Sequence, residues 1–208
     1  MKEPKIITSY MESLRGRILE TATKAFVANG IKAVKMDDVA QSMGISKRTL
    51  YEIYTNKETL LYACMKEMKE RKRREYEEVF KESSNVMDVI LKMYRLGVDE
   101  FKLTSPEFYD DMAKYPSVIQ LFREDNLRTH DNLIRFMQRG VDEGYFRKDV
   151  NLELVSMVFS ALSKYINENQ LYKNYSIEEL FHNLVFVSIR GFCTPKGVEL
   201  LEKHLDHL

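Results

Sequence analysis

Apolar residues recur at steps of three and four along nearly the whole chain. This spacing predicts amphipathic helices, and only eight glycines and four prolines interrupt it among 208 residues. We therefore expect an all-α protein with two domains, the first over residues 1–61 and the second, a helical bundle, over residues 62–208. Residues 1–8 carry no periodic pattern, so we expect them to form a mobile tail.

The first two predicted helices end at glycines. The first is expected to begin at Ser9, which has capping-box spacing to Glu12, and to end at Gly30. The second covers residues 36–43. Its start should lack a side-chain cap, because Lys35 stands where a Ser, Thr or Asp is expected.

The stretch 44–61 carries the clearest functional pattern. Ser46 is a good N-cap, and behind it Leu50, Ile53 and Tyr54 form one apolar face. The residues left to face outward are Lys47, Arg48, Thr49 and Tyr51. A short cationic helix after a glycine turn is typical of a helix-turn-helix that enters the major groove of double-stranded DNA.

Charge is distributed unevenly, although the formal net charge is zero. Residues 1–75 contain 16 Lys and Arg against 10 Asp and Glu, so the remaining residues contain 16 against 22. A basic N-terminal part and an acidic C-terminal part favour approach to a polyanion in one orientation. Chance segregation of charges is the alternative interpretation.

The cysteines and the hydropathy pattern place the protein in the cytoplasm. Cys64 and Cys193 are far apart and form no CxxC or Cys/His cluster, which indicates buried apolar residues, not a disulfide or a zinc site. No signal peptide and no apolar run near 20 residues is present, so we expect no membrane association.

The second domain is predicted to contain further helices after a connecting helix over residues 56–83, which Asn56 caps. Capping or proline signals indicate that they start at Asn85, Pro106, Pro116, Asn151, Ser176 and Pro195. We expect the helix from Pro116 to continue to about Gly140, the next to run to about Asn169, and the helix from Ser176 to end at Gly191.

One predicted helix of this bundle suggests a ligand site. Asn126 and His130 lie four residues apart within an apolar stripe, and such polar groups need partners that a ligand would supply. The alternative is a core or interface histidine that a neighbouring helix satisfies. Candidate walls for the site are Tyr94, Phe101, Phe122, Met137 and Phe159.

Catalytic motifs are missing from the sequence. The four histidines form no HExxH motif, and no glycine-rich phosphate loop occurs. We therefore expect no enzyme activity, no metal and no cofactor.

Residues 17–61 resemble the DNA-binding domain of the TetR family of transcriptional regulators. The elements that carry the resemblance are the Ala/Phe pattern of the first helix, AxxxGIS at 40–46, LYxxY at 50–54 and the NKExL helix start. The remaining two thirds resembles the family only in size and helical layout. This implies a ligand-binding and dimerisation domain.

The resemblance also implies positions at the DNA. It places Lys47, Arg48 and Thr49 at the groove, Tyr51 along a sugar-phosphate strand and Lys57 on a phosphate. The remaining candidates for DNA contact are Lys35, Met36, Ser46 and Tyr54. Lys35 replaces the family's usual Thr, and it could keep that residue's contact with a phosphate. Tyr54 replaces the commoner Phe, and its hydroxyl could add a contact with the DNA backbone.

Direct readout is expected from two of these residues. An arginine can pair with guanine through two hydrogen bonds, and a threonine methyl can contact a thymine methyl, which assigns base readout to Arg48 and Thr49. The alternative is that Lys47 and Arg48 form a solvated surface.

The last two long helices carry the expected homodimer interface. In the family, such a pair forms a four-helix interface between subunits, and an intramolecular core face is the alternative. The candidate residues are Val155, Val158, Leu162, Leu180, Leu184, Val187, Ser188 and Gly191. A dimer would place two reading helices roughly 34 Å apart and select a near-palindromic operator.

These expectations combine into a one-component transcriptional regulator, a repressor released from DNA by a small apolar or aromatic effector. A ligand-independent DNA-binding or architectural protein is one alternative, and an α-helical enzyme is another. A filled core in the second domain would favour the architectural protein, whereas metal-dependent turnover would favour the enzyme.

Overall fold

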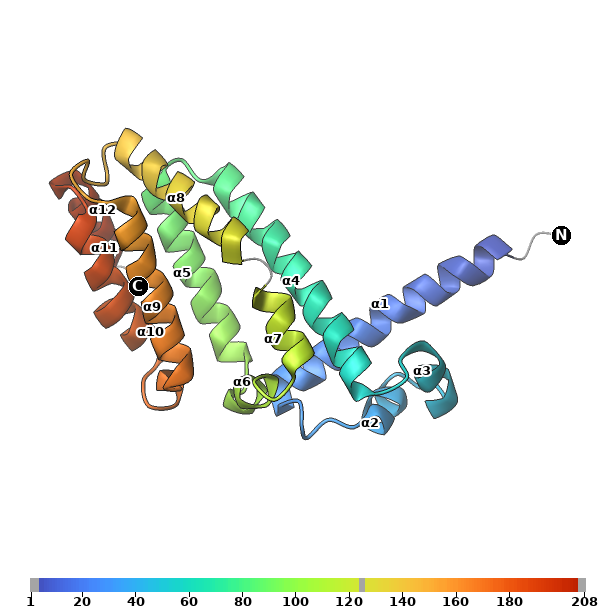
Figure 1. Ribbon diagram of the computed structural model, residues 1–208. Coiled ribbons are helices and arrows are strands. Elements are labelled where there is room, and N and C mark those ends of the chain that lie inside the picture. The colour runs from blue at the N-terminus through green and yellow to red at the C-terminus, as the bar shows by residue number, and fades with distance from the viewer. Residues whose placement is uncertain (1–3, 124–125, 206–208) are drawn as a thin grey trace. The chain divides into compact units, whose positions relative to one another are not determined.

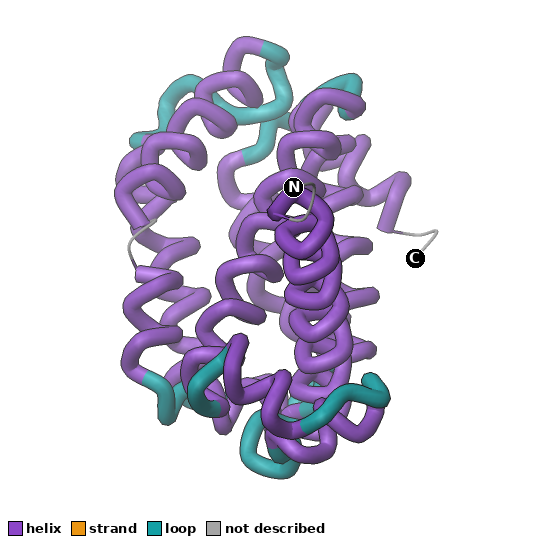
Figure 2. The backbone as a smooth tube through the Cα atoms, turned by 90° about the vertical axis from the view of Figure 1, so that its right-hand side faces the viewer, coloured by secondary structure: helices purple, strands orange, loops and turns teal. Residues whose placement is uncertain are grey.

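The computed structural model describes the backbone of residues 4–123 and 126–205, and the side chains of residues 9–122, 131–203 and 205. Within these ranges every regular element is a helix, and the β structure is limited to an isolated bridge between Phe146 and Cys193 (Figure 2). The prediction of an all-α protein is confirmed.

The helices follow one another with short connections (Figure 1). The α-helices are α1 (Pro4–Asn29), α2 (Met36–Ser42), α3 (Lys47–Ile53), α4 (Lys57–Glu82), α5 (Val86–Leu103), α6 (Pro106–Met112), α7 (Pro116–Arg123), α8 (Asn126–Asp142), α9 (Leu152–Glu168), α10 (Ile177–Leu180), α11 (Val187–Phe192) and α12 (Pro195–Leu205). A 3₁₀ turn, Leu171–Lys173, follows α9, and a π-helical segment, Phe181–Phe186, joins α10 to α11.

The chain divides into two compact units. The first contains Met1–Arg74 and Leu103–Arg123, and the second contains Glu75–Lys102 and Glu124–Leu208. Compactness therefore groups α6 and α7 with the first three helices, whereas the sequence suggested a division at residue 61. That functional division stays a prediction, because compactness alone does not define a functional domain.

The first unit is built on the apolar stripe of α1. Leu14, Ile18, Ala22 and Phe26 are at most 3% exposed, which confirms the predicted inward face of this helix. They pack in one cluster with residues of the following three helices, including Val39, Ala40, Leu50, Leu60 and Leu61. Helices α6 and α7 complete the same core with Phe108, Val118 and Leu121.

A glycine allows α6 to pack closely against the end of α1. Gly30 has φ +80°, and a Cβ there would lie 2.8 Å from the Cβ of Glu107. The buried Asp111 carboxylate accepts hydrogen bonds from the Lys32 N–H at 2.6 Å and from Lys114 Nζ at 2.8 Å. The turn between α1 and α2 is therefore held by α6.

The second unit has a core that is rich in aromatic rings. Edge-to-face pairs join Tyr94 to Phe181 and Phe186, and join Phe192 to Phe146 and Phe159. Leu91, Val98, Met137, Ile189 and Leu201 fill the spaces between the rings.

The predicted start of the first helix is wrong. Helix α1 begins at Pro4, so the expected tail over residues 1–8 is helical from residue 4, and Ser9 lies inside the helix instead of capping it. Proline is tolerated at the first helical position because its missing N–H has no helical partner there, which allows the helix to extend past the capping signal. Residues 1–3 lie outside the described part of the chain.

The helix expected from Pro116 to Gly140 is described in two parts, α7 and α8, and residues 124–125 between them lie outside the described part of the chain. Val118 and Leu121 of α7 belong to the first core, whereas Met137 of α8 belongs to the second.

The helix predicted from Ser176 to Gly191 contains a π-helical segment and ends one residue later, at Phe192. Its predicted capping box is confirmed, since Ser176 Oγ accepts from the Glu179 N–H at 3.1 Å and Glu179 accepts from the Ser176 N–H at 2.8 Å. None of the described helices has the length and apolar character needed to cross a membrane.

Candidate nucleic-acid interface

The turn between α2 and α3 is fixed by its glycine. Gly44 has φ +65°, its N–H donates to the Gln41 carbonyl at 3.1 Å, and the Ile45 N–H donates to the Ala40 carbonyl at 3.1 Å. This is a Schellman motif, which ends α2 and turns the chain sharply. The sequence pattern predicted this turn.

The start of α3 is capped as predicted. Ser46 Oγ accepts from the Thr49 N–H at 3.0 Å and lies 2.8 Å from Thr49 Oγ1. Leu50 is fully buried and anchors the helix in the first core, while Lys47, Arg48 and Tyr51 are exposed. The predicted inward and outward faces of α3 are therefore confirmed, and Thr49 lies half-buried at their edge.

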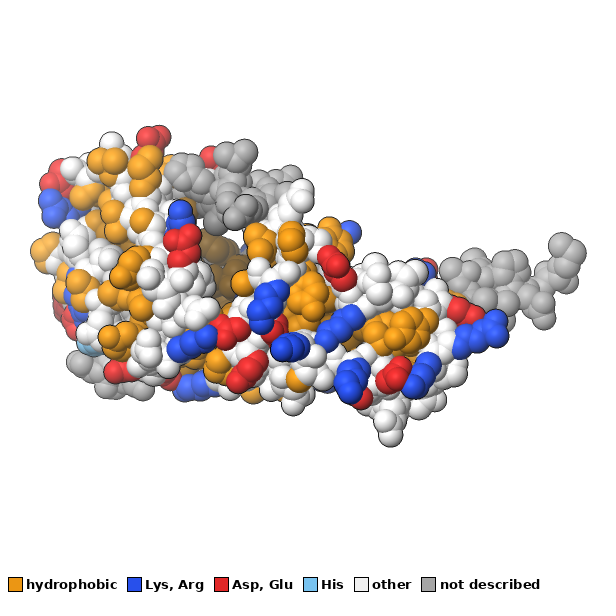
Figure 3. Space-filling view, turned by 60° about the horizontal axis from the view of Figure 1, so that its bottom comes forward, with side chains coloured by type: hydrophobic (Ala, Val, Ile, Leu, Met, Phe, Trp, Pro, Cys, Tyr) orange, Lys and Arg blue, Asp and Glu red, His pale blue; other side chains and the backbone are white. Residues whose placement is uncertain are grey.

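Two carboxylates share the outward surface with these cations. Lys47 Nζ pairs with Asp37 of α2, and this hydrogen bond raises the pKa of the Lys47 ammonium. Arg48 Nε donates to Glu52 Oε1 at 2.8 Å. Acidic and basic side chains alternate on the surface of the first unit (Figure 3), which makes the surface less basic than the cations alone suggest.

Neither carboxylate was expected on this surface from the sequence. The spacing of Arg48 and Glu52, four residues apart, predicts an ion pair within one helix and could have revealed Glu52. The pairing of Asp37 with Lys47 joins two helices, so it required the geometry of the turn.

The start of α2 has half of a capping box. Lys35 offers no side-chain acceptor, as expected, but its own N–H donates to Asp38 Oδ2 at 2.9 Å. Asp38 thus satisfies the Lys35 N–H, while the helix start has no side-chain cap, as predicted. The Lys35 side chain is exposed and available for a phosphate contact.

Lys57 lies at the start of α4, which Asn56 caps by accepting from the Thr59 N–H at 2.9 Å. Its Nζ donates to the Lys32 carbonyl at 3.2 Å, and partial burial lowers the pKa of the ammonium. A cation beside the free N–H groups of a 26-residue helix suits a phosphate.

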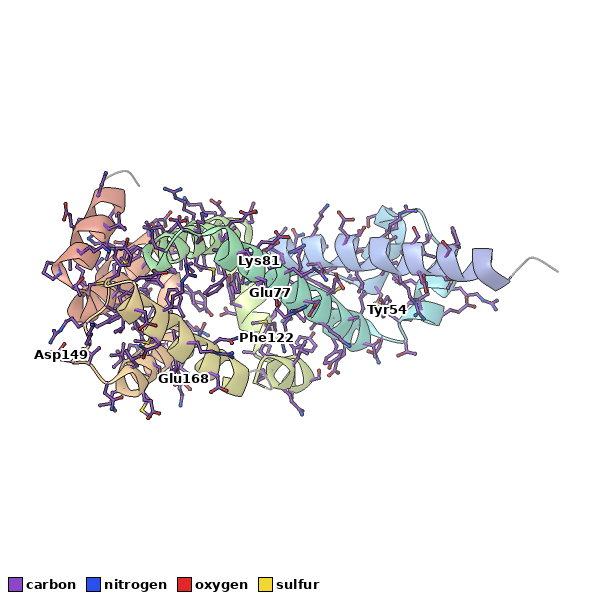
Figure 4. The ribbon with its side chains drawn as sticks, turned by 90° about the horizontal axis from the view of Figure 1, so that it is seen from above. Tyr54, Glu77, Lys81, Phe122, Asp149 and Glu168 are labelled. Atoms are coloured by element: carbon purple, nitrogen blue, oxygen red, sulfur yellow. The ribbon has the colours of Figure 1, made fainter. Side chains whose placement is uncertain are left out.

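Two candidate DNA contacts face inward instead. The Met36 side chain is 6% exposed and belongs to the first core. Tyr54, at the end of α3 (Figure 4), is half-buried against the same core, and burial raises the pKa of its hydroxyl. The structure therefore leaves Lys35, Ser46, Lys47, Arg48, Thr49, Tyr51 and Lys57 as the better-placed candidates.

The second unit contains an apolar cavity of about 120 Å³. Its lining is entirely apolar and consists of Ile90, Leu133, Phe136, Met137, Phe146, Phe159, Ile189 and Phe192. Of the predicted ligand-site residues, Met137 and Phe159 are among them. Tyr94, Phe101 and Phe122 do not line this cavity.

The remaining ligand-site candidates are dispersed. Tyr94 is buried against Phe181, and Phe101 is half-buried on α5. Phe122 projects from α7 of the first unit and is 38% exposed (Figure 4). The side chains of Asn126 and His130 lie outside the described residues, so their role stays a prediction.

An exposed apolar strip runs along α9. Val158 is 53% exposed, and Leu154, Met157 and Tyr165 are at least as exposed. Among the candidate interface residues on the next helices, Val187 and Gly191 are exposed as well. Val155, Leu162, Leu184 and Ser188 are half-buried. Leu180 is 4% exposed and packs inside its own unit, so it does not lie on this surface.

Two helices joined by a glycine turn, with a capped cationic helix facing outward, define a DNA-binding protein of the helix-turn-helix class. Residues 18–64 match the family model described as bacterial regulatory proteins, tetR family. This match assigns residues 18–64 to the TetR family of transcriptional regulators.

The relatives are remote in sequence. The chain is 22% identical over 154 residues to the HTH-type transcriptional repressor KstR2 of Mycobacterium tuberculosis, which covers 72% of this chain and 77% of KstR2. A putative transcriptional regulator from Saccharomonospora viridis, solved in complex with choline, has a TM-score of 0.71 at 16% identity over 88% of this chain and 99% of that one. A transcriptional regulator from Cytophaga hutchinsonii has a TM-score of 0.67 at 20% identity, over 85% and 97%. At these identities the structural likeness shows the fold.

Proposed function

We propose that this protein is a cytoplasmic transcriptional repressor that reads double-stranded DNA with the outward surface of α3. The observation that carries the proposal is the position of Arg48, exposed on a helix that Ser46 caps and Leu50 anchors. The name of KstR2 as a repressor supports the direction of regulation. Both cysteines are free and buried, which fits a reducing compartment.

We propose that the DNA-binding form is a homodimer that contacts a near-palindromic operator. The exposed strip of α9 supports this, since apolar side chains at helical spacing form a surface that a second copy would cover. Two copies related by a two-fold axis would present their α3 helices to half-sites roughly 34 Å apart.

The apolar cavity of the second unit is the proposed effector site. A cavity without polar lining favours an aromatic ring or a short hydrocarbon, because a polar group there would lose its hydrogen bonds to water. Apolar cavities of roughly 150 Å³ bind benzene, so benzene is a suitable probe. An effector releases DNA only if it prefers the conformation that binds DNA poorly.

The test is recovery of bound fragments from a random DNA pool by the purified full-length chain. The proposal predicts enrichment of one motif with two-fold symmetry, and weaker binding of that motif in the presence of benzene. Recovery of fragments without a shared motif would contradict sequence-specific regulation. Binding that benzene leaves unchanged would contradict the effector site while leaving DNA recognition intact.

A further inference from the structure

The most outward pair of residues on α3 consists of a base and an acid. In an α-helix each residue turns the chain by about 100°, so Arg48 and Glu52 lie about 160° from the buried Leu50, one on each side of the opposite point. Their side chains are 88% and 60% exposed. If the outward surface of α3 enters a DNA groove, the side chains of Arg48 and Glu52 enter it together.

The hydrogen bond between Arg48 and Glu52 leaves other polar atoms of both side chains available to contact bases. Glu52 Oε1 accepts from Arg48 Nε at 2.8 Å, and no further partner of either side chain is found among the described residues. The two terminal nitrogens of Arg48 can therefore donate to guanine O6 and N7, while Glu52 Oε2 can accept another hydrogen bond.

A carboxylate in the major groove needs a donor, because the phosphates on both sides repel it. The cytosine N4 amino group is the base donor to which Glu and Asp side chains bind in direct readout. An exposed ion pair within one helix contributes little to stability, so folding alone gives Glu52 no strong role.

We propose that Glu52 is a specificity-determining residue that accepts a hydrogen bond from cytosine N4, next to a guanine that Arg48 contacts. Residues four apart rise by about 6 Å along a helix, and base pairs are about 3.4 Å apart, so the two bases lie within about two steps of each other. The Nε hydrogen bond gives Glu52 a second role, as it orients the Arg48 guanidinium toward its base. This inference rests on the proposed reading of DNA by α3.

The experiment uses the operator selected by the wild-type chain and a panel of duplexes in which each half-site position carries each of the four bases in turn. Affinities are measured at one salt concentration for the wild type, Glu52→Gln and Asp37→Asn. Asp37→Asn is the matched control, because it also removes one carboxylate that pairs with a cation of the same surface.

We expect wild-type binding to fall about tenfold or more when the cytosine next to the Arg48-dependent guanine is replaced. Glu52→Gln should lose that preference, or transfer it to adenine, which glutamine recognises through N6 and N7. Asp37→Asn should bind all the duplexes more tightly by a similar factor and keep the preference.

The proposal is overturned if Glu52→Gln keeps the wild-type preference at every position and gains affinity uniformly, as the control does. Glu52 would then act only through its charge. If the wild type selects no motif at all, the proposed function fails before this comparison begins, so the two failures are distinguishable.

Discussion

Asp111 of α6 belongs to a set of hydrogen bonds that also includes the turn after α1 and the start of α4. It accepts from the Lys32 N–H, while the Lys32 carbonyl accepts from Lys57, the proposed phosphate contact. Burial alone would raise the pKa of the Asp111 carboxyl, but hydrogen bonds from Lys114 and the Lys32 N–H outweigh burial and hold its pKa below the ordinary value. The charged form therefore stabilises the folded protein.

We predict that Asp111→Asn lowers the free energy of unfolding by about 1–3 kcal/mol at pH 7, because it weakens hydrogen bonds at a buried site. A lowered pKa means that this stabilisation is complete above the ordinary value of 3.8 and is lost as the pH falls through the folded pKa. The difference between wild type and variant should thus shrink below about pH 4.

Urea unfolding at pH 7 and at pH 3 measures this difference. Asp99→Asn is the control, since it removes a carboxylate from an exposed position on α5. An equal difference between wild type and Asp111→Asn at both pH values would show that ionisation of Asp111 does not contribute.

At the scale of single elements, α9 and α11 each have an inward and an outward apolar side. One side of these helices forms the aromatic core and its cavity. The other side of α9 carries an exposed strip that includes Val158, about 100° around the helix from Phe159. Ligand binding and self-association can therefore be tested separately.

We predict that Leu133→Phe abolishes benzene binding, because the larger ring fills the cavity that Leu133 lines. Benzene should raise the melting temperature of the wild type and not that of the variant. Leu154→Phe makes the same change on the exposed strip and should respond like the wild type. An equal benzene shift in Leu133→Phe would place the ligand elsewhere.

We predict that Val158→Glu converts the dimer to a monomer, because a charge would be buried against apolar side chains of the second copy. Sedimentation equilibrium measures the mass directly. Ser160→Glu adds the same charge to α9 on an exposed side away from the strip, and it should remain dimeric. A dimeric Val158→Glu variant would remove α9 from the interface.

For the molecule as a whole, local patterns predicted most helices, because caps and apolar periodicity act within a few residues. Ser46, Asn56, Asn151 and Ser176 all cap the helices expected of them. What depends on packing between distant segments could not be predicted in this way.

Three features needed those distant contacts. Helices α7 and α8 contribute to different cores. Asp37 meets Lys47 only across the turn. Met36 was a candidate DNA contact and Leu180 a candidate dimer contact, yet tertiary packing buries both. The outward surface of α3 was therefore predicted in outline, whereas its carboxylates and the cavity lining required the structure.

In the proposed function, Arg48 recognises a base and Lys57 contacts a phosphate. The most direct measurement compares the affinities of Arg48→Ala and Lys57→Ala for the selected operator and for a random duplex of equal length, across a range of salt concentrations. Each variant removes one positive charge, so each is the other's control.

We predict that Arg48→Ala loses about 5- to 150-fold on the operator and much less on random DNA, as expected for one pair of hydrogen bonds to guanine. Lys57→Ala should lose similar factors on both duplexes and flatten the salt dependence by about one unit of slope. Equal losses on the two duplexes for Arg48→Ala would contradict base reading by α3.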